Sequence, residues 1–311
     1  MTFRSPAVPA ALALALALPA ASAWSQGESS SKTLTFSGSV ALGAEHNSNL
    51  SVSQLESASG KSDIATTLDG NIDMNWRPTA RVNGTAGYSY SGSRYRDIES
   101  FDLDMHLLFA DLSYDFKLLT IGANYYFADA NLGGDDFLHL NQYSVYAGKL
   151  FGAQKWYIRG ALTSNRKTFT TFITRDADNA GASLDLYRFF NMGRSSLSLG
   201  YAYEDEDTRG AAFDYAADTL RLRLSHRFRM FARSATLRLG YRWQDRAYAS
   251  DTPSIGRPRD DSQQVADARL ELTLREHLNL IARWENGDYS SYLPSADFND
   301  SRFGLALELF F

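Results

Sequence analysis

The chain has 311 residues, a formal net charge of −5 and no cysteine, which excludes a disulfide framework and argues against nucleic acid as a general partner. Aromatic residues make up 13% of the sequence even though its average is polar. This mixture fits a transmembrane sheet with aromatic residues at the membrane boundary, and it also fits a β-rich binding protein.

The first residues have the pattern of an export signal. Arg4 precedes the apolar run "AALALALAL" at residues 10–18, and Ala21-Ser22-Ala23 matches a cleavage motif. We assign residues 1–23 to a signal peptide and residues 24–33 to a short periplasmic segment. Beyond residue 23 no apolar run of about 18 residues occurs, so a membrane-spanning helix is not expected.

From residue 34 onward, apolar and polar residues alternate with the period of two that is typical of β-strands. The alternating segments repeat at a spacing that suits tilted strands crossing a membrane. We predict about fourteen strands, at residues 34–44, 68–76, 82–90, 101–116, 119–127, 143–151, 156–162, 180–190, 197–203, 220–228, 237–243, 270–274, 278–284 and 302–311. The alternation is blurred in 101–116 and 180–190, where a β-bulge is one explanation.

The connections between these segments alternate between short and long along the whole chain. Short links are expected near residues 77–78, 116–117, 152–153, 191–193, 230–231 and 275–276. Long polar links are expected at residues 46–62, 91–100, 128–137, 166–179, 204–217, 247–263 and 287–299. Outer-membrane barrels have short periplasmic turns and long extracellular loops, whereas a soluble sandwich has no reason to sort its connections. The sequence therefore predicts an all-β fold at residues 34–311, a closed antiparallel transmembrane β-barrel in a bacterial outer membrane.

The last strand carries an apolar face that runs to the final residue. Its members are Phe303, Leu305, Leu307, Leu309 and Phe311. In a membrane barrel these residues face lipid, and the strand has to pair with the first one so that no backbone group is left unpaired in hydrocarbon. The pattern resembles the C-terminal signal, ending in Phe, by which outer-membrane proteins are recognised for assembly. The partners implied are the barrel assembly machinery, outer-membrane lipid and lipopolysaccharide.

If the leucines of the later strands face lipid, the arginines that alternate with them face the lumen. The expected basic wall consists of Arg221, Arg223, Arg227, Arg238, Arg242, Arg269 and Arg283. The expected acidic wall on the early strands consists of Asp69, Asp73, Asp102 and Asp104. We expect the two walls to oppose one another across the lumen and to produce a transverse field that orients dipolar solutes. The alternative is that these charges pair into salt bridges that fill the barrel, and the sequence leaves both open.

No pattern for catalysis or for a cofactor accompanies these walls. The five histidines lack metal-ligand spacing, and the acidic stretches at residues 133–136 and 204–207 are more often solvated loop charge than a Ca²⁺ site. No hydrolase or nucleotide-binding motif occurs, and the adjacent Ser225 and His226 point to opposite faces of their strand. We therefore expect no catalytic residue, no metal, no cofactor and no enzymatic activity.

Four stretches resemble the porin-like C-terminal barrel of the surface lipoprotein assembly modifier (Slam) family. They are "GAEHNSNLSV" at residues 43–52, "RDADNAGASLDLY" at 175–187, "RPRDDSQQVADARLEL" at 257–272 and the closing segment from residue 283. The resemblance implies a barrel that delivers lipoproteins to the cell surface. Members of that family carry a periplasmic tetratricopeptide domain before the barrel, which residues 24–33 are too short to supply. That activity would then require a separate periplasmic partner.

Three functions remain open from the sequence. The leading hypothesis is a transport conduit for small hydrophilic solutes, with the arginines favouring anions, or for an extended polymer. The first alternative is a translocation or assembly factor for surface-exposed lipoproteins or polysaccharide. The second alternative is a plugged barrel with a structural or adhesive role.

Overall fold

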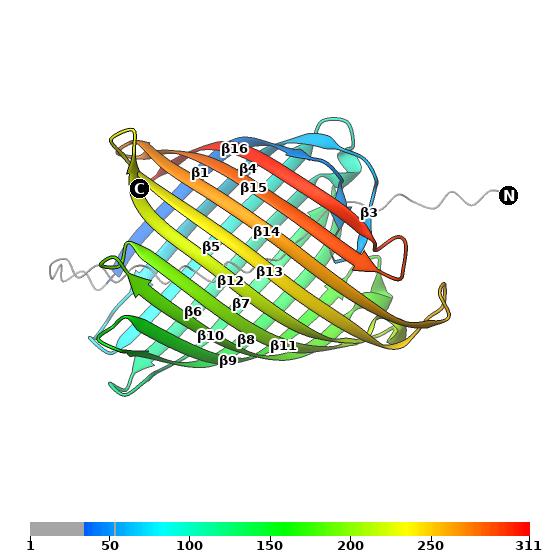
Figure 1. The fold of residues 1–311 in the computed structure, drawn as a ribbon, viewed down its shortest axis with the longest axis horizontal. Coiled ribbons are helices and arrows are strands. Elements are labelled where there is room, and N and C mark those ends of the chain that lie inside the picture. Colours follow the sequence, from blue (N-terminus) through cyan, green and yellow to red (C-terminus); the bar gives the residue numbers. More distant parts are fainter. Residues whose placement is uncertain (1–33, 53) are drawn as a thin grey trace.

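Fourteen strands pair antiparallel in chain order, and the first strand pairs with the last, so the sheet closes into a barrel (Figure 1). The computed structural model describes residues 34–52 and 54–311. The strands of the barrel are β1 (Leu34–Asn47), β4 (Asp63–Trp76), β5 (Val82–Tyr95), β6 (Leu103–Asp115), β7 (Thr120–Leu132), β8 (Asp135–Phe151), β9 (Trp156–Phe169), β10 (Ala177–Phe190), β11 (Ser195–Thr208), β12 (Tyr215–Met230), β13 (Arg233–Thr252), β14 (Arg257–Arg275), β15 (Leu278–Ser291) and β16 (Phe298–Phe310). The predicted fold class is confirmed, whereas the expected signal peptide and the segment 24–33 lie outside the described residues.

The barrel closes between its first and last strands, β1 and β16, as the sequence predicted. Leu42 of β1 lies opposite Leu307 of β16, and the Phe311 amide donates a hydrogen bond of 3.0 Å to the Gly38 carbonyl. This pairing satisfies backbone groups that hydrocarbon could not satisfy.

The outer face is apolar, as the alternation predicted. Phe303, Leu305, Leu307 and Leu309 are exposed by 52%, 48%, 51% and 62%. Large apolar side chains on the other strands, such as Leu222 and Leu239, are exposed in the same way. Such a continuous apolar belt is stable only in contact with acyl chains. Within the described residues, no helix is long and apolar enough to cross a membrane.

The two ends of the barrel differ in how the strands are joined. At the end where the C-terminus lies, the turns are short, for example residues 231–232 between β12 and β13 (Figure 1). At the other end, several of the expected long loops are partly strand, because β7 continues to Leu132 and β13 continues to Thr252. The barrel wall therefore extends beyond the apolar belt on the extracellular side. Three short 3₁₀ helices lie in these connections, η1 (Glu99–Phe101), η2 (Ile173–Arg175) and η3 (Ala211–Phe213).

The strand register is continuous where the sequence had suggested a bulge. β6 and β10 pair with both of their neighbours without a shift. Shifts occur instead in β7–β8 near Ala130, in β13–β14 after Ala247 and in β14–β15 near Thr273. In β6 the alternation is blurred for another reason. Leu107 and Phe109 face the lumen near the buried Tyr126, so apolar residues lie on both faces of this part of the strand.

The connection between β1 and β4, residues 48–62 and called loop 1 below, folds into the barrel mouth instead of projecting away. It contains a small hairpin of β2 (Ser51–Val52) and β3 (Ser57–Ala58). Leu50 and Val52 are completely buried and Leu55 is nearly so. Their apolar cluster is completed by residues from η1 and β7–β9, namely Phe101, Ala130, Leu132, Phe137, Leu138 and Phe169. Loop 1 is therefore anchored by hydrophobic packing inside the extracellular end of the barrel.

Candidate functional site

The tip of loop 1 ends in a carboxylate that three arginines surround. Glu56 accepts a hydrogen bond of 3.0 Å from Arg246 and one of 3.3 Å from Arg175. Arg259 and the Tyr248 hydroxyl also donate to this carboxylate. We call these five residues the Glu56 cluster. They come from loop 1, η2, β13 and β14, so loop 1 crosses the mouth and is held on the far wall.

Backbone contacts add to this attachment. The Arg175 guanidinium also donates to the carbonyl oxygens of Gln54 and Leu55, at 3.1 and 3.2 Å. At the base of the loop, the buried Ser51 hydroxyl donates to the Asp300 carboxylate at 2.7 Å. Loop 1 is thus fixed at its base and at its tip by polar contacts, with the apolar cluster between them.

The charge of Glu56 is maintained despite its burial. Burial alone would raise the pKa of the Glu56 carboxyl, but Arg175, Arg246 and Arg259 together with the Tyr248 hydroxyl outweigh it and lower the pKa to about 2. The carboxylate is therefore ionised at neutral pH. A buried ion pair of this kind contributes little when compared with apolar packing, but removing one partner is strongly destabilising.

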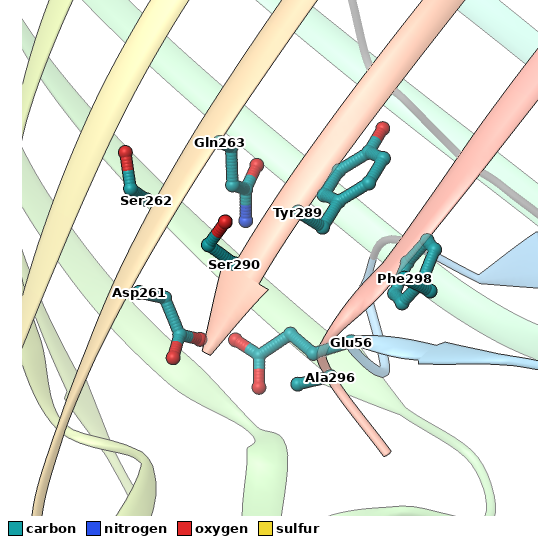
Figure 2. Close-up of a pocket in the computed structure, with 8 residues that line it drawn as sticks. All are labelled: Glu56, Asp261, Ser262, Gln263, Tyr289, Ser290, Ala296 and Phe298. Carbon is teal, nitrogen blue, oxygen red and sulfur yellow. The ribbon is translucent and has the colours of Figure 1, made fainter. Parts of the chain in front are cut away.

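Little free space remains around the tip. A cavity of about 10 Å³ lies between Glu56, Asp261 and Tyr289, and Figure 2 shows the two carboxylates turned toward one another. Arg259 lies 2.9 Å from the Asp261 carboxylate and also donates to Glu56, which explains how the two acids share this position. A second cavity of about 20 Å³ lies between Glu56, Arg175 and Arg246 on the other side of the tip. Each has room for about one water molecule.

Deeper in the barrel, three arginines occupy one row across neighbouring strands. Arg238 of β13 lies opposite Arg269 of β14, which in turn lies opposite Arg283 of β15. We call them the arginine row. Like charges directly opposite one another destabilise a sheet, so this row requires compensation by anions. Glu271 lies 3.1 Å from Arg238 and 3.8 Å from Arg269, and Asp69 lies 2.9 Å from Arg283. Among the described residues, two carboxylates thus lie within 4.0 Å of the three guanidinium groups.

A second like-charged pair lies on the adjoining strands. Arg221 of β12 lies opposite Arg242 of β13, and the Asp185 carboxylate is 3.8 Å from Arg221. Within the described part of the chain, Arg223, Arg227 and Arg242 have no ion-pair partner within 4.0 Å. The structure thus places four of the seven expected basic-wall residues in ion pairs and three outside them, on one continuous stretch of wall from β12 to β15.

Only half of the expected acidic wall lies in the lumen. Asp69 faces inward from β4, and so does Asp73, which accepts a hydrogen bond of 2.7 Å from Asn71. Asp104 faces outward instead, on the same side of β6 as the exposed Leu108, and Arg94 binds it at 2.7 Å. The prediction was wrong for Asp104 because the uninterrupted apolar run at residues 107–109 concealed which residues face lipid.

Asp102 also lies outside the expected wall. It precedes β6 and ends η1, where its carboxylate accepts a hydrogen bond of 2.7 Å from the Tyr95 amide. It therefore stabilises a connection at the barrel rim.

The expected opposition of the two walls is correct only in part, because the basic wall extends from β15, close to the acidic residues, to β12, which lies nearly half a circuit from β4. The transverse field stays a prediction. β4 and β15 are separated only by β1 and β16 in the closed sheet, which is why Asp69 reaches Arg283. In a closed barrel the two ends of the chain are neighbours, and the strands that face one another are half a circuit apart. Asp69 therefore borders the arginine row at the seam, where β15 comes close to β4.

A serine and a histidine form a pair on the neighbouring strands β11 and β12. His226 pairs with Ser195 at 2.8 Å between Nδ1 and Oγ, and its sequence neighbour Ser225 is not involved. Among the described residues, no group of three or more His, Asp or Glu is arranged to hold a metal ion.

Sequence reasoning missed the Glu56 cluster. One available signal was the presence of Leu50, Val52 and Leu55 in an otherwise polar connection, since solvated loops do not need three large apolar side chains. Arg175 and Arg259 lie within stretches of the sequence that resemble the Slam barrel, but no local pattern connects them to Glu56.

Comparison with solved structures places this barrel among outer-membrane proteins. OmpT of Vibrio cholerae, folded in vitro and in trimer form, is similar with a TM-score of 0.51 at 10% identity, covering 90% of this chain and 100% of that chain. The outer-membrane channel DcaP of Acinetobacter baumannii has a TM-score of 0.51 at 8% identity, with coverages of 92% and 99%. An anion-selective porin from Comamonas acidovorans has a TM-score of 0.50 at 10% identity, with coverages of 89% and 99%.

No model of a known protein family matches the chain, and no curated protein matches it in sequence. At these identities the structural likeness establishes the fold alone. Together with the closed sheet and the apolar belt, it makes the chain a porin-like barrel of the outer membrane of Gram-negative bacteria.

Proposed function

We propose that this barrel is an outer-membrane conduit for small hydrophilic anions, with loop 1 narrowing its extracellular mouth. The observation that carries the proposal is the arginine row, in which three facing guanidinium groups have two carboxylates within 4.0 Å among the described residues. An excess of positive charge on a lumen wall attracts anions and repels cations, most strongly where the passage is narrow.

The basic stretch beside the row supports the same direction of selectivity. Arg223 and Arg227 of β12 and Arg242 of β13 add positive charge that the described residues do not neutralise by ion pairs. Arg227 lies nearer the short turns than Arg223, so the basic wall continues from the arginine row toward the periplasmic end. An anion would therefore meet a favourable potential along this length of the lumen.

Single-channel recording in planar bilayers under a salt gradient tests the proposal, because the reversal potential reports which ion permeates. The full chain is expected to prefer chloride over potassium, and Arg269→Gln is expected to reduce that preference. Arg166→Gln is the matched control, since it removes the same charge from an exposed pair with Asp178 away from the row. Cation selectivity in the unaltered chain, or equal effects of the two variants, would contradict the proposal.

A second candidate function is the passage of an extended chain, such as a surface lipoprotein or a polysaccharide, with help from a periplasmic partner. It is supported by the way three of the stretches that resemble the Slam barrel converge on the mouth. They contribute Leu50 and Val52 of loop 1, Arg175 of η2, and Arg259 of β14. Loss of a surface antigen when the chain is deleted, with no change in anion flux, would favour this function over the first.

A further inference from the structure

We propose that Glu56 is a tethered ligand in a carboxylate-binding site, and that an incoming solute bearing a carboxylate displaces it and loosens loop 1 from the mouth. The site is formed by Arg175, Arg246, Arg259 and Tyr248. The displacement of loop 1 as a way to regulate entry rests on the anion conduit proposed above. The existence of the carboxylate-binding site rests on the local geometry alone.

The geometry around Glu56 is that of a carboxylate receptor. Arg246 and Tyr248 donate to Oε1, while Arg175 and Arg259 donate to Oε2. Oε1 is therefore bound by one charged and one neutral donor and Oε2 by two charged donors, and charge-assisted hydrogen bonds of this kind are the strong ones in carboxylate recognition. The donors come from three parts of the barrel wall, so the receptor does not depend on loop 1 for its own framework.

The donors also retain unused capacity. The Nε atoms of Arg246 and Arg259 are buried and have no hydrogen-bond partner among the described residues. Arg259 is 2% exposed and is one of the most deeply buried side chains of the described chain. A ligand with oxygens beyond one carboxylate, such as a sugar acid, would supply acceptors for such groups.

The charge balance of the region shows what a ligand has to provide. The Glu56 cluster continues into a neighbouring network, in which Lys167 lies 2.5 Å from Glu206, and the Tyr215 hydroxyl lies within hydrogen-bond distance of both Glu204 and Glu206. The cations are Lys167, Arg175, Arg246 and Arg259, and the carboxylates are Glu56, Glu204, Glu206 and Asp261. Four positive charges meet four negative ones, so removal of Glu56 leaves one uncompensated positive charge. A single carboxylate restores neutrality.

The backbone of Glu56 favours its own release. Its φ of 51° lies in the left-handed region, which non-glycine residues seldom occupy and which stores strain. The hydrogen bonds of the carboxylate hold this conformation. Once another carboxylate occupies the donors, the tip of loop 1 can relax away from the wall, while Leu50 and Val52 keep the base in place.

Chemical rescue provides the first test. Glu56→Ala removes the carboxylate and leaves its position between two cavities. We expect acetate to raise the unfolding temperature of the purified Glu56→Ala barrel in detergent, and to have no such effect on the unaltered chain. Chloride at the same ionic strength is the reference salt. Glu99→Gln is the control variant, because it removes an exposed acidic charge from the same end of the barrel without touching the cluster.

Direct binding provides the second test and remains informative if the first variant folds poorly. Titration calorimetry measures the binding of glucuronate and of its neutral counterpart glucose. We expect Glu56→Gln to bind glucuronate at least about tenfold more tightly than the unaltered chain does, because this is the change in affinity expected when one competing charge-assisted hydrogen bond is lost. Glucose is expected to show no binding. A further Arg259→Gln change is expected to abolish glucuronate binding.

The results separate this inference from the proposed conduit. Acetate rescue with glucuronate binding supports the site even if no anion current is measured, in which case the conduit fails alone. Anion current without rescue or binding in either Glu56 variant overturns the site and leaves the conduit intact. Equal effects of acetate and chloride, or of glucuronate and glucose, also overturn it.

Discussion

Glu56→Gln tests how strongly the Glu56 cluster holds loop 1, because it removes the charge and preserves the size of the side chain. The pKa of the Glu56 carboxyl is lowered from 4.5 to about 2 in the folded protein. At about 1.4 kcal/mol for each tenfold change in an equilibrium constant, this difference corresponds to a stabilisation of about 3 kcal/mol by the ionised carboxylate. We expect the variant to lose a free energy of unfolding of that size.

The apolar anchor of the same loop is larger. Leu50, Val52 and Leu55 are all buried, and a fully buried aliphatic side chain contributes about 1.5–3 kcal/mol, so together they contribute about 6 kcal/mol. Loss of the Glu56 charge should therefore loosen the tip without releasing the base of the loop.

Two measurements on the folded barrel separate these effects. Urea unfolding from lipid vesicles gives the change in stability, and hydrogen–deuterium exchange locates it. Exchange should increase at residues 54–58 and remain slow at Leu50. Glu99→Gln, which removes an exposed charge, should change neither quantity. If Glu56→Gln had the stability and exchange of the unaltered chain, the cluster would not be what holds the tip.

Four further outcomes follow from the same structure. The pKa of Glu56 is lower in the folded protein than in the unfolded chain, so the stability difference between the unaltered chain and Glu56→Gln should be complete above about pH 5 and disappear as the pH falls toward about 2. Urea unfolding at each pH measures this difference. A difference that persists at pH 2 would contradict the prediction. Leu50→Ala should destabilise the barrel by about 2–5 kcal/mol in the same assay and increase exchange over the whole of loop 1, so an increase confined to the tip would be unexpected. Leu307→Arg places a charge in the lipid-facing belt and should cost about 2–4 kcal/mol in vesicles, and a neutral effect would place this face elsewhere. Asp69→Asn leaves Arg283 without its 2.9 Å partner and should shift the reversal potential further toward chloride, whereas a shift toward potassium would argue against the lumen position of this pair.

The fold was predictable because a membrane barrel is specified by local patterns. Alternation with a period of two identifies which residues of β12 and β16 face lipid, and these predictions agree with the exposure of Leu222 and Leu307. Closure was equally predictable, since the final strand could not remain unpaired in hydrocarbon.

The arrangement of charges was less accessible, because it depends on which strands are neighbours after closure. The sequence separation of Asp69 and Arg283 suggested opposite walls, but the closed sheet brings them within 2.9 Å of one another. The predicted orientation of Asp104 was wrong for a different reason, because the apolar run beside it is compatible with Asp104 facing either the lumen or lipid. Neither error could be corrected from alternation alone.

The Glu56 cluster was inaccessible because its members have no local relation. Arg175 and Arg259 are separated from Glu56 by 119 and 203 positions in the sequence, and they meet it only because loop 1 folds inward. A connection between two strands carries no period that predicts such a fold. The buried Leu50 and Val52 show that hydrophobic packing directs the loop, and the arginines then fix its tip.

The conductance of the chain with and without loop 1 shows whether the barrel is an anion conduit that this loop narrows. Asn47 and Asp63 face one another at the ends of β1 and β4, so residues 49–60 can be replaced by a short glycine–serine turn that preserves the hairpin. In planar bilayers, the shortened chain should give larger current steps than the unaltered chain and keep the same preference for chloride. Absence of current from both chains, or a preference for potassium once the loop is removed, would contradict an anion conduit narrowed by loop 1.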